Sequence, residues 1–328
     1  IFDVPLIESV PDWDGAWSMT THNHGITDAT PYVAMSAYGE TFVVGGDNYN
    51  SNQGRIRIHQ LINGSWAFQQ QVIGISAGSY YGRGIDITEN GDVIAVGAYD
   101  QGNTGYVYIY RHNGSSWVSD QTFRNSNYAM DDFYGYAVSL SDNGNRLAVG
   151  AIKEDGATNS ITDSGAVFIH DYDGSNWSEI AVVRASDAES GDVFGRVALN
   201  PDGDKLMVVA ANGYAAYLYD LSSLDVTDWQ ATEQIFASPG VDDDYFGVNG
   251  YDFRGGMIAL GANYDDNAFS SYVSNTEIDG DFNGLDSASV GTFDKTDNSV
   301  TNSGATYLIR LDGNVLSSVT PLQARIDA

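Results

Sequence analysis

An internal repeat limits what this chain can fold into more than any other feature of its sequence. Four pairs of an aromatic residue and a glycine mark it, at intervals of 53, 60 and 52 residues: Tyr81-Gly82, Tyr134-Gly135, Phe194-Gly195 and Phe246-Gly247. After each pair come an alternating apolar stretch, a glycine turn and a second apolar run that ends in small residues, such as 93–98. A third alternating run follows, and then a glycine turn with Trp before a fourth run, as at 113–117.

Four short strands of period two, joined by glycine turns and repeated about every 50 residues, are typical of propeller blades. An earlier copy lacks the aromatic-glycine pair but keeps the runs 33–35 and 42–46. The second run of each copy is apolar at successive positions, which indicates a strand buried between neighbouring blades. The sequence therefore predicts an all-β fold, a β-propeller of four-stranded blades with five identifiable repeats.

The number of blades follows less directly from the sequence. Residues 1–28 contain the segment 14–17 (Asp-Gly-Ala-Trp), which resembles the turn and Trp before a fourth strand. We therefore expect 1–28 to supply an N-terminal strand of a further blade and 29–328 to form the propeller. Either five blades close into a ring with one decorating strand, or the chain is part of a larger ring, whose strand edges would favour self-association. Because the chain begins at Ile1 without a leader, we expect a mature or excised piece rather than a complete gene product.

Composition excludes several classes of partner. The chain has 44 Asp+Glu against 14 Lys+Arg, a net charge of −30, and 36 of the acids are Asp. A basic face for nucleic acid or for an anionic membrane surface is excluded by this balance, and no apolar run is long enough for insertion into a membrane. The absence of Cys excludes disulfides and thiolate metal sites. A surface rich in Asp and poor in Lys is suited to a saline environment, where salt screens the repulsion between carboxylates. We therefore expect an extracellular or cell-surface location.

The repeat also resembles a known family. The stretch 184–195 (RASDAESGDVFG) resembles the opening of an FG-GAP repeat, the unit of integrin-alpha-type propellers, and Val149-Gly150-Ala151 matches the end of that repeat. The resemblance covers roughly residues 30–313. It implies a β-propeller of extracellular type, whose relatives bind proteins, glycans or calcium, and it implies no reaction.

The longest departure from the repeat is the acidic insertion at 263–303, and long loops of this kind are usually functional or disordered. Within it, the segment that begins at Asp279 has oxygen side chains at its first, third and fifth places and Gly at its sixth. This spacing is typical of a calcium loop. The candidate ligands are Asp279, Asp281, Asn283 and Asp286. The FG-GAP calcium motif ends with Asp at position nine, where this chain has Ser287. Both a calcium site and a solvated acidic loop therefore remain open.

Other polar groups support weaker hypotheses. His22 and His24 lie two residues apart, so on a strand they could share a metal, but the sequence locates no third ligand and an ordinary surface pair is the favoured explanation. The other three histidines, His59, His112 and His170, are each expected to follow a third strand or to begin the loop after it. The acidic pair 131–132 before an aromatic-glycine pair could line a rim or accept backbone hydrogen bonds in a turn.

These features favour an extracellular binding or adhesion module that recognises a protein or glycan ligand and is stabilised by calcium. The insertion 263–303 is the expected contact region. An alternative is a propeller-fold polysaccharide lyase or other carbohydrate-active enzyme. A lyase needs a His or Tyr base beside a cation that neutralises the substrate charge, but no motif assembles these groups in the sequence. A third hypothesis is a structural subunit of an extracellular assembly.

Overall fold

The computed structural model describes residues 32–212, 215–223, 225–229, 231–236, 246–254, 257–262, 305–312 and 315–322. These residues form five four-stranded antiparallel sheets, each of which is contiguous in the sequence. The predicted all-β fold of four-stranded blades is therefore confirmed, and we refer to the sheets as blades 1 to 5. The predicted N-terminal strand segment 1–28 and the insertion 263–303 lie outside the described ranges.

The strands of each blade are hydrogen-bonded in chain order. Blade 1 contains β1 (Tyr32–Met35), β2 (Thr41–Gly46), β3 (Arg55–Ile62) and β4 (Ser65–Ile73). Blade 2 contains β5 (Tyr81–Ile87), β6 (Val93–Ala98), β7 (Tyr106–His112) and β8 (Trp117–Phe123). Blade 3 contains β9 (Tyr134–Leu140), β10 (Arg146–Ala151), β11 (Ala166–Tyr172) and β12 (Trp177–Val183). Blade 4 contains β13 (Phe194–Leu199), β14 (Lys205–Ala210), β15 (Ala215–Asp220) and β16 (Ala231–Phe236). Blade 5 contains β17 (Phe246–Arg254), β18 (Met257–Ala262), β19 (Ala305–Asp312) and β20 (Val315–Leu322).

Helical structure in the described ranges is limited to short turns. They are α1 (Tyr49–Asn52), η1 (Gln101–Asn103) and η2 (Val226–Asp228). None of these turns has the length and apolarity that crossing a membrane requires.

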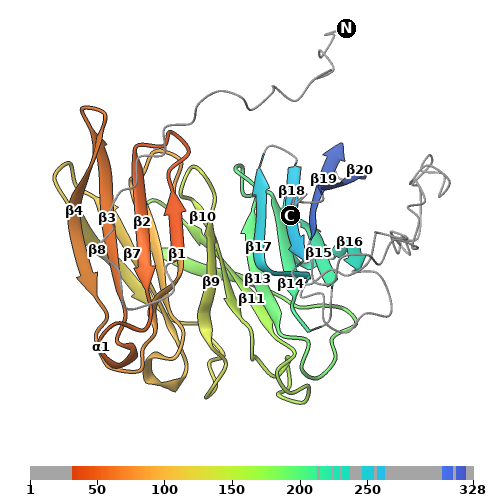
Figure 1. The fold of residues 1–328 in the computed structure, drawn as a ribbon. Coiled ribbons are helices and arrows are strands. Elements are labelled where there is room, and N and C mark those ends of the chain that lie inside the picture. The colour runs from red at the N-terminus through yellow and green to blue at the C-terminus, as the bar shows by residue number, and fades with distance from the viewer. Residues whose placement is uncertain are drawn as a thin grey trace, which may run out of the picture.

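The first strand of each blade lies toward the middle of the molecule and the fourth strand lies outside. Figure 1 shows β9, β13 and β17 in the middle, β4 and β8 at one side, and β16 and β20 at the other. The first strands of neighbouring blades are in contact, β5 with β9 and β9 with β13. Residues at the start of these inner strands are therefore brought together although they are more than 50 positions apart in the sequence.

The hydrophobic core is divided into clusters that lie between adjacent blades. One cluster joins Val43 and Ile56 of blade 1 to Tyr81 and Ile94 of blade 2. Equivalent clusters join blade 2 to blade 3 and blade 3 to blade 4. All six residues of β2 and all six of β6 are buried. Each of these second strands lies between the first and third strands of its own blade, and it packs against a neighbouring blade. The predicted burial of the second strand is confirmed.

Main-chain contacts between glycines set the distance between blades at the inner end. A Cβ placed on Gly45, Gly97 or Gly150 would lie 1.8 Å from the carbonyl oxygen of the glycine that follows the aromatic residue in the next blade. Isolated parallel bridges lie beside this contact and pair Gly54 with Tyr81, Gly105 with Tyr134 and Gly165 with Phe194. The repeated aromatic-glycine pair and the small residues at the end of the second strand are therefore the two sides of one seam.

A glutamine in the fourth strand connects two of the blades at their outer side. The side chain of Gln121 in β8 donates to the carbonyl oxygen of Trp177 (3.1 Å) and accepts from the Trp177 N–H (2.8 Å). Gln70 in β4 makes the same pair of bonds with Trp117 of blade 2, at 2.8 and 3.0 Å. Trp117 and Trp177 are themselves buried, in the clusters between blades 1 and 2 and between blades 2 and 3 respectively.

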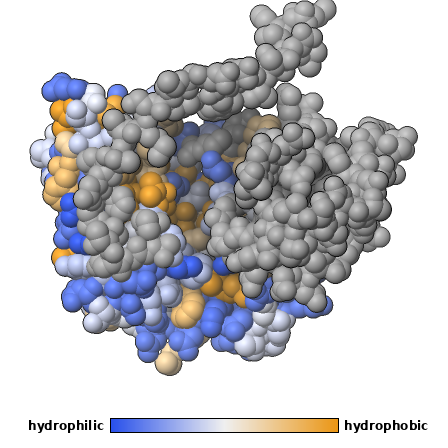
Figure 2. Space-filling view, in the orientation of Figure 1, coloured by the Kyte–Doolittle hydropathy of each residue, from blue (hydrophilic) through white to orange (hydrophobic). Residues whose placement is uncertain are grey.

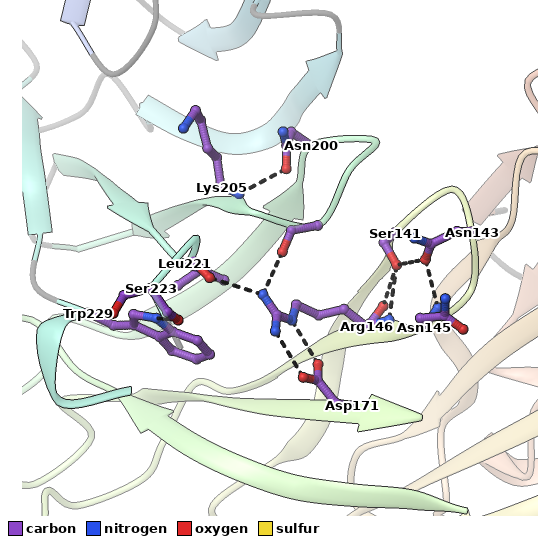
Figure 3. Close-up of polar contacts among 11 residues, drawn as sticks. Ser141, Asn143, Asn145, Arg146, Asp171, Asn200, Lys205, Leu221, Ser223 and Trp229 are labelled. Atoms are coloured by element: carbon purple, nitrogen blue, oxygen red, sulfur yellow. Dashed lines mark hydrogen bonds and ion pairs between the residues drawn. The ribbon is translucent and has the colours of Figure 1, made fainter. Parts of the chain in front are cut away.

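Arg146 connects blade 3 to blade 4 in a network that Figure 3 shows. Its Nε and Nη2 bind the two carboxylate oxygens of Asp171 at 2.7 and 2.8 Å within blade 3. Its Nη1 donates to the carbonyl oxygens of Gly203 (2.9 Å) and Leu221 (3.2 Å) in blade 4, and the guanidinium lies 5.2 Å from the ring of Trp229. Arg146 thus satisfies two backbone acceptors of blade 4, although its own strand, β10, pairs only with β9 and β11 of blade 3.

We expect Arg146→Met to lower the free energy of unfolding by about 2 kcal/mol, since it removes a bidentate ion pair and two bonds between blades, all partly exposed to solvent. Urea unfolding followed by Trp fluorescence measures this loss. Asp171→Asn is the matched control, because it removes the ion pair within blade 3 and leaves the bonds of Arg146 Nη1 to Gly203 and Leu221 in place. Asp171→Asn is expected to lose less than about 1 kcal/mol. Equal losses in the two variants would contradict a role in joining blades.

Candidate ligand-binding site

After three of the four aromatic-glycine pairs, the next residue is large and polar and lies at the start of an inner strand. These residues are Arg83 in β5, Tyr136 in β9 and Arg196 in β13, and all three are partly exposed. In each strand the pairing register shifts beside this residue, between Tyr81 and Ile85 in β5 for example. Such an irregularity redirects a side chain out of the normal alternation. Three blades therefore each present one large polar side chain near the middle of the molecule.

Arg83 is at the centre of this group. Its Nη1 donates to the hydroxyl of Tyr32 at 2.5 Å, and its Nη2 donates to the hydroxyl of Tyr136. The same guanidinium is 4.1 Å from the centroid of the Tyr136 ring, and Nη1 is 3.6 Å from Oδ2 of Asp47. One cation of blade 2 is thus shared by a phenol and a carboxylate of blade 1 and a phenol of blade 3.

Further aromatic and cationic groups extend the site. The ring of Tyr99 is 5.3 Å from the ring of Tyr136, and the guanidinium of Arg196 is 5.6 Å from that same ring. Tyr251 in β17 is near enough to Arg196, Tyr136 and Arg83 for their charges to influence its pKa. We call these seven residues the Arg–Tyr cluster: Tyr32, Asp47, Arg83, Tyr99, Tyr136, Arg196 and Tyr251. In the space-filling view, hydrophilic and hydrophobic residues lie side by side toward the middle of this face of the molecule (Figure 2).

Burial dominates the protonation of three tyrosines in this cluster, Tyr32, Tyr99 and Tyr251. It raises the pKa of Tyr251 to about 12, although the positive charge of Arg196 opposes this shift. Burial likewise raises the pKa of Tyr32 and of Tyr99, in both cases against the charge of Arg83. Burial works against the charge on Arg83, but the neighbouring phenols Tyr136 and Tyr32 raise its pKa overall. At neutral pH these three tyrosines are therefore neutral phenols, which can donate and accept hydrogen bonds, beside the charged guanidinium of Arg83.

Two atoms of the cluster are buried without a hydrogen-bond partner among the described residues. They are Oδ1 of Asp47 and Nη1 of Arg196. Buried polar atoms in folded proteins are nearly always hydrogen-bonded, to protein or to another molecule. The cluster therefore has one acceptor and one charged donor available for a bound molecule.

The predicted metal ligands are not among these residues. Asp279, Asp281, Asn283 and Asp286 lie outside the described ranges, and so do His22 and His24. Within those ranges no group of three or more His, Asp or Glu side chains is placed to hold a metal ion. The acidic pair before Tyr134 has the predicted turn role, since Oδ2 of Asp132 accepts the N–H of Ala129 at 2.6 Å.

The prediction for three histidines was wrong in part. His59 and His170 lie inside the third strands β3 and β11, and each is at least 98% buried. His112 is the last residue of β7. The strands extend past the apolar run because aromatic neighbours cover the imidazoles: His59 stacks on Phe42 at 4.7 Å, and Nε2 of His170 is 3.2 Å from the hydroxyl of Tyr134.

Sequence reasoning missed the Arg–Tyr cluster, although a signal for it was present. When the repeats are aligned on their aromatic-glycine pairs, the next position holds Arg83, Tyr136 and Arg196 in three successive copies. A large polar residue at one position of an otherwise apolar inner strand indicates a side chain that faces the middle of the molecule. Asp47 and Tyr99 share a second repeat position, directly after the small residues that end β2 and β6.

Comparisons with known proteins agree with this fold. Residues 117–170 match the family model of the FG-GAP repeat. No curated protein matches the sequence. The periplasmic gluconolactonase PpgL of Pseudomonas aeruginosa is similar in structure, with a TM-score of 0.52 and 12% identity over 89% of this chain and 85% of the other. A protein of Bacteroides fragilis, provisionally assigned as a 6-phosphogluconolactonase, has a TM-score of 0.54 and 10% identity over 89% of this chain and 70% of the other.

At such low identity these two structures show the fold alone, and both are β-propellers. The family match falls on the end of blade 2 and the first three strands of blade 3, where the aromatic-glycine pair, the glycine seam and the buried second strand all occur. The chain is thus a β-propeller protein that carries an FG-GAP repeat.

Proposed function

We propose that this chain is an extracellular binding module that recognises a glycan through the Arg–Tyr cluster. The observation that carries the proposal is the convergence of partly exposed Arg and Tyr side chains from the inner strands of successive blades. Aromatic rings offer flat apolar faces with a polar edge, and the guanidinium groups offer several donors, a combination that suits a hydroxylated and partly apolar ligand such as a sugar. A protein ligand is the less favoured alternative, because the cluster is a small group of seven residues rather than a broad surface.

An extracellular or periplasmic location agrees with the FG-GAP repeat, with the acidic composition and with the periplasmic location in the name of the Pseudomonas aeruginosa neighbour. The calcium site at Asp279, Asp281, Asn283 and Asp286 stays a prediction, as a stabiliser of the insertion 263–303. Neither point is needed for binding at the cluster, because every residue of the cluster lies in the described ranges.

A second candidate function is a polysaccharide lyase. The observation that favours it is the direct contact between phenol hydroxyls and a guanidinium, Tyr32 and Tyr136 with Arg83. A lyase needs a group that removes a proton beside a cation that stabilises the resulting charge, and a tyrosine beside an arginine can serve. The raised pKa of Tyr32 works against its use as a base at neutral pH, so we place binding first.

The test is glycan binding by the wild-type chain and by Arg83→Gln, with a glycan array followed by calorimetry. We expect Arg83→Gln to weaken binding about 10- to 100-fold, because it removes the charge-assisted hydrogen bonds that hold Tyr32 and Tyr136 in place, and such a bond contributes about 1.5–3 kcal/mol. Arg111→Gln is the control, since Arg111 forms an ion pair with Asp120 on β7 and β8, outside the cluster. Absorbance near 235 nm, followed in the same incubations, detects the unsaturated product of a lyase. Binding that is unchanged in Arg83→Gln while its thermal stability is also unchanged would contradict the proposal.

A further inference from the structure

The second arginine of the cluster lacks a counterion in the part of the chain that the structure describes. Arg83 has Asp47 at 3.6 Å, whereas Arg196 forms no ion pair with any described residue. Both guanidinium groups lie within 6 Å of the centroid of the Tyr136 ring, so two positive charges share one aromatic side chain. Two positive charges beside the same ring repel each other, and an anion bound at Arg196 would reduce this repulsion.

The surroundings of the Arg196 guanidinium indicate which kind of anion would bind there. Its Nη1 is shielded from solvent and has no hydrogen-bond partner among the described residues. A guanidinium has a planar fork of donors that matches the two oxygens of a carboxylate. A carboxylate carries one negative charge, which suits a site where one of the two arginines already has Asp47 as its counterion.

Asp47 adds a second requirement. Its side chain is 5% exposed, its Oδ2 faces Arg83, and its Oδ1 has no donor among the described residues. Burial raises the pKa of Asp47, and the charge of Arg83 and nearby backbone N–H groups oppose this shift. In its ionised form the carboxylate only accepts hydrogen bonds, so a bound molecule that supplies a donor would satisfy Oδ1. A hydroxyl group is the donor that a sugar offers, and the rings of Tyr32, Tyr99, Tyr136 and Tyr251 provide apolar faces for its C–H groups.

We infer that the ligand of the Arg–Tyr cluster is a sugar acid, a uronate residue of an acidic glycan, whose carboxylate binds Arg196 and one of whose hydroxyls donates to Asp47. This inference rests on the proposed function and adds the chemical class of the ligand. It assigns separate tasks to the two arginines: Arg83 holds Tyr32 and Tyr136 in place, and Arg196 recognises the charge.

The experiment is calorimetry with uronate oligosaccharides (galacturonate, glucuronate, mannuronate and guluronate) and with their carboxyl-reduced neutral counterparts. The wild-type chain is expected to bind at least one uronate about tenfold or more tightly than its reduced counterpart. Arg196→Gln is expected to lose this preference and to keep the affinity for the neutral sugar. Arg124→Gln is the control, since Arg124 also lies over tyrosine rings, those of Tyr106 and Tyr128, but belongs to the end of blade 2 outside the cluster.

The outcomes separate this inference from the proposed function. If neutral and acidic sugars bind equally, or if Arg196→Gln keeps the preference for uronate, the sugar-acid inference is wrong and glycan binding stands. If sulfated neutral oligosaccharides bind and uronates do not, the anion is a sulfate ester and the inference is again wrong. If no oligosaccharide of either kind binds, both the inference and the proposed function fail. Should Arg196→Gln unfold, Arg196→Lys keeps the charge without the fork and is expected to reduce the preference for uronate severalfold.

Discussion

Gly97→Ala is expected to lower the free energy of unfolding by more than about 3 kcal/mol, a larger loss than that expected for Arg146→Met. The added Cβ would lie 1.8 Å from the carbonyl oxygen of Gly135 and 2.8 Å from its carbonyl carbon. Both atoms belong to the main chain of the neighbouring blade, so no side chain can rotate away to make room. Blades 2 and 3 would have to separate along their inner edge, where their shared hydrophobic cluster is buried. Chemical denaturation monitored by circular dichroism measures the loss.

Gly114→Ala is the matched control for this substitution. Gly114 has a φ of +96° and no atom within 4 Å of the position of a Cβ, so alanine there meets backbone strain and no clash. We expect a loss of about 1 kcal/mol. A Gly97→Ala protein as stable as Gly114→Ala would show that the seam is not packed as described. Blade 4 carries Val209 at the register position of Gly97, so its seam with blade 5 cannot use the same glycine contact.

Acidification from pH 7 to pH 4 is expected to remove about 3 kcal/mol of stability through His170 alone. Burial lowers the pKa of His170 to about 4, because the imidazole lies among Phe123, Tyr134 and its own strand. The unfolded chain takes up a proton at its ordinary pKa of about 6.5, whereas the folded chain keeps the imidazole neutral until about pH 4. The unfolded state therefore binds more protons within this window, so stability is full above it and falls as pH decreases through it.

The repeats supply a matched variant for this prediction. The register position of His170 in blade 3 corresponds to Tyr110 in blade 2, and the Tyr81 hydroxyl donates to that of Tyr110 at 2.9 Å, as Tyr134 contacts His170. His170→Tyr should therefore lose the extra acid sensitivity, and the reciprocal Tyr110→His should gain a second sensitive group. Urea unfolding at pH 7 and at pH 4 gives, for each of the three proteins, the difference in the free energy of unfolding between the two pH values. A substitution that changes stability equally at both pH values leaves this difference unaltered. An identical pH dependence in wild type and His170→Tyr would contradict the prediction.

Hydrophobic periodicity was enough to predict the strands, their order and the burial of the second strand. In β6, for example, every residue of the run 93–98 is apolar or small, and such a run has few alternatives to a strand buried on both faces. Trp117 and Trp177 were also predictable, since a large ring after an exposed glycine turn finds cover only against a neighbouring blade.

The polar contacts between blades could not be predicted in the same way. Gln121 belongs to a mostly exposed strand, and only the arrangement of two blades turns its amide toward the main chain of Trp177. The Arg–Tyr cluster depends on register shifts that redirect Arg83 and Arg196, and the amino-acid pattern does not specify such shifts. The sequence also misplaced His170. A polar residue usually marks the end of a buried run, but in β11 the imidazole of His170 is buried and contacts the hydroxyl of Tyr134.

The division of the core into clusters between successive blades has a consequence for cooperativity. Three described clusters each join one blade to the next along the chain, so the free energy of folding approximates a sum over single blades and nearest-neighbour interfaces. Blade 3 takes part in two of these interfaces, and its opening would break both. Within the described part of the chain, blade 4 is linked to Arg83 in blade 2 through blade 3 and through the Arg–Tyr cluster. A molecule that bridges Arg83 and Arg196 would therefore couple two blades that share none of these three clusters, and would make their unfolding more cooperative.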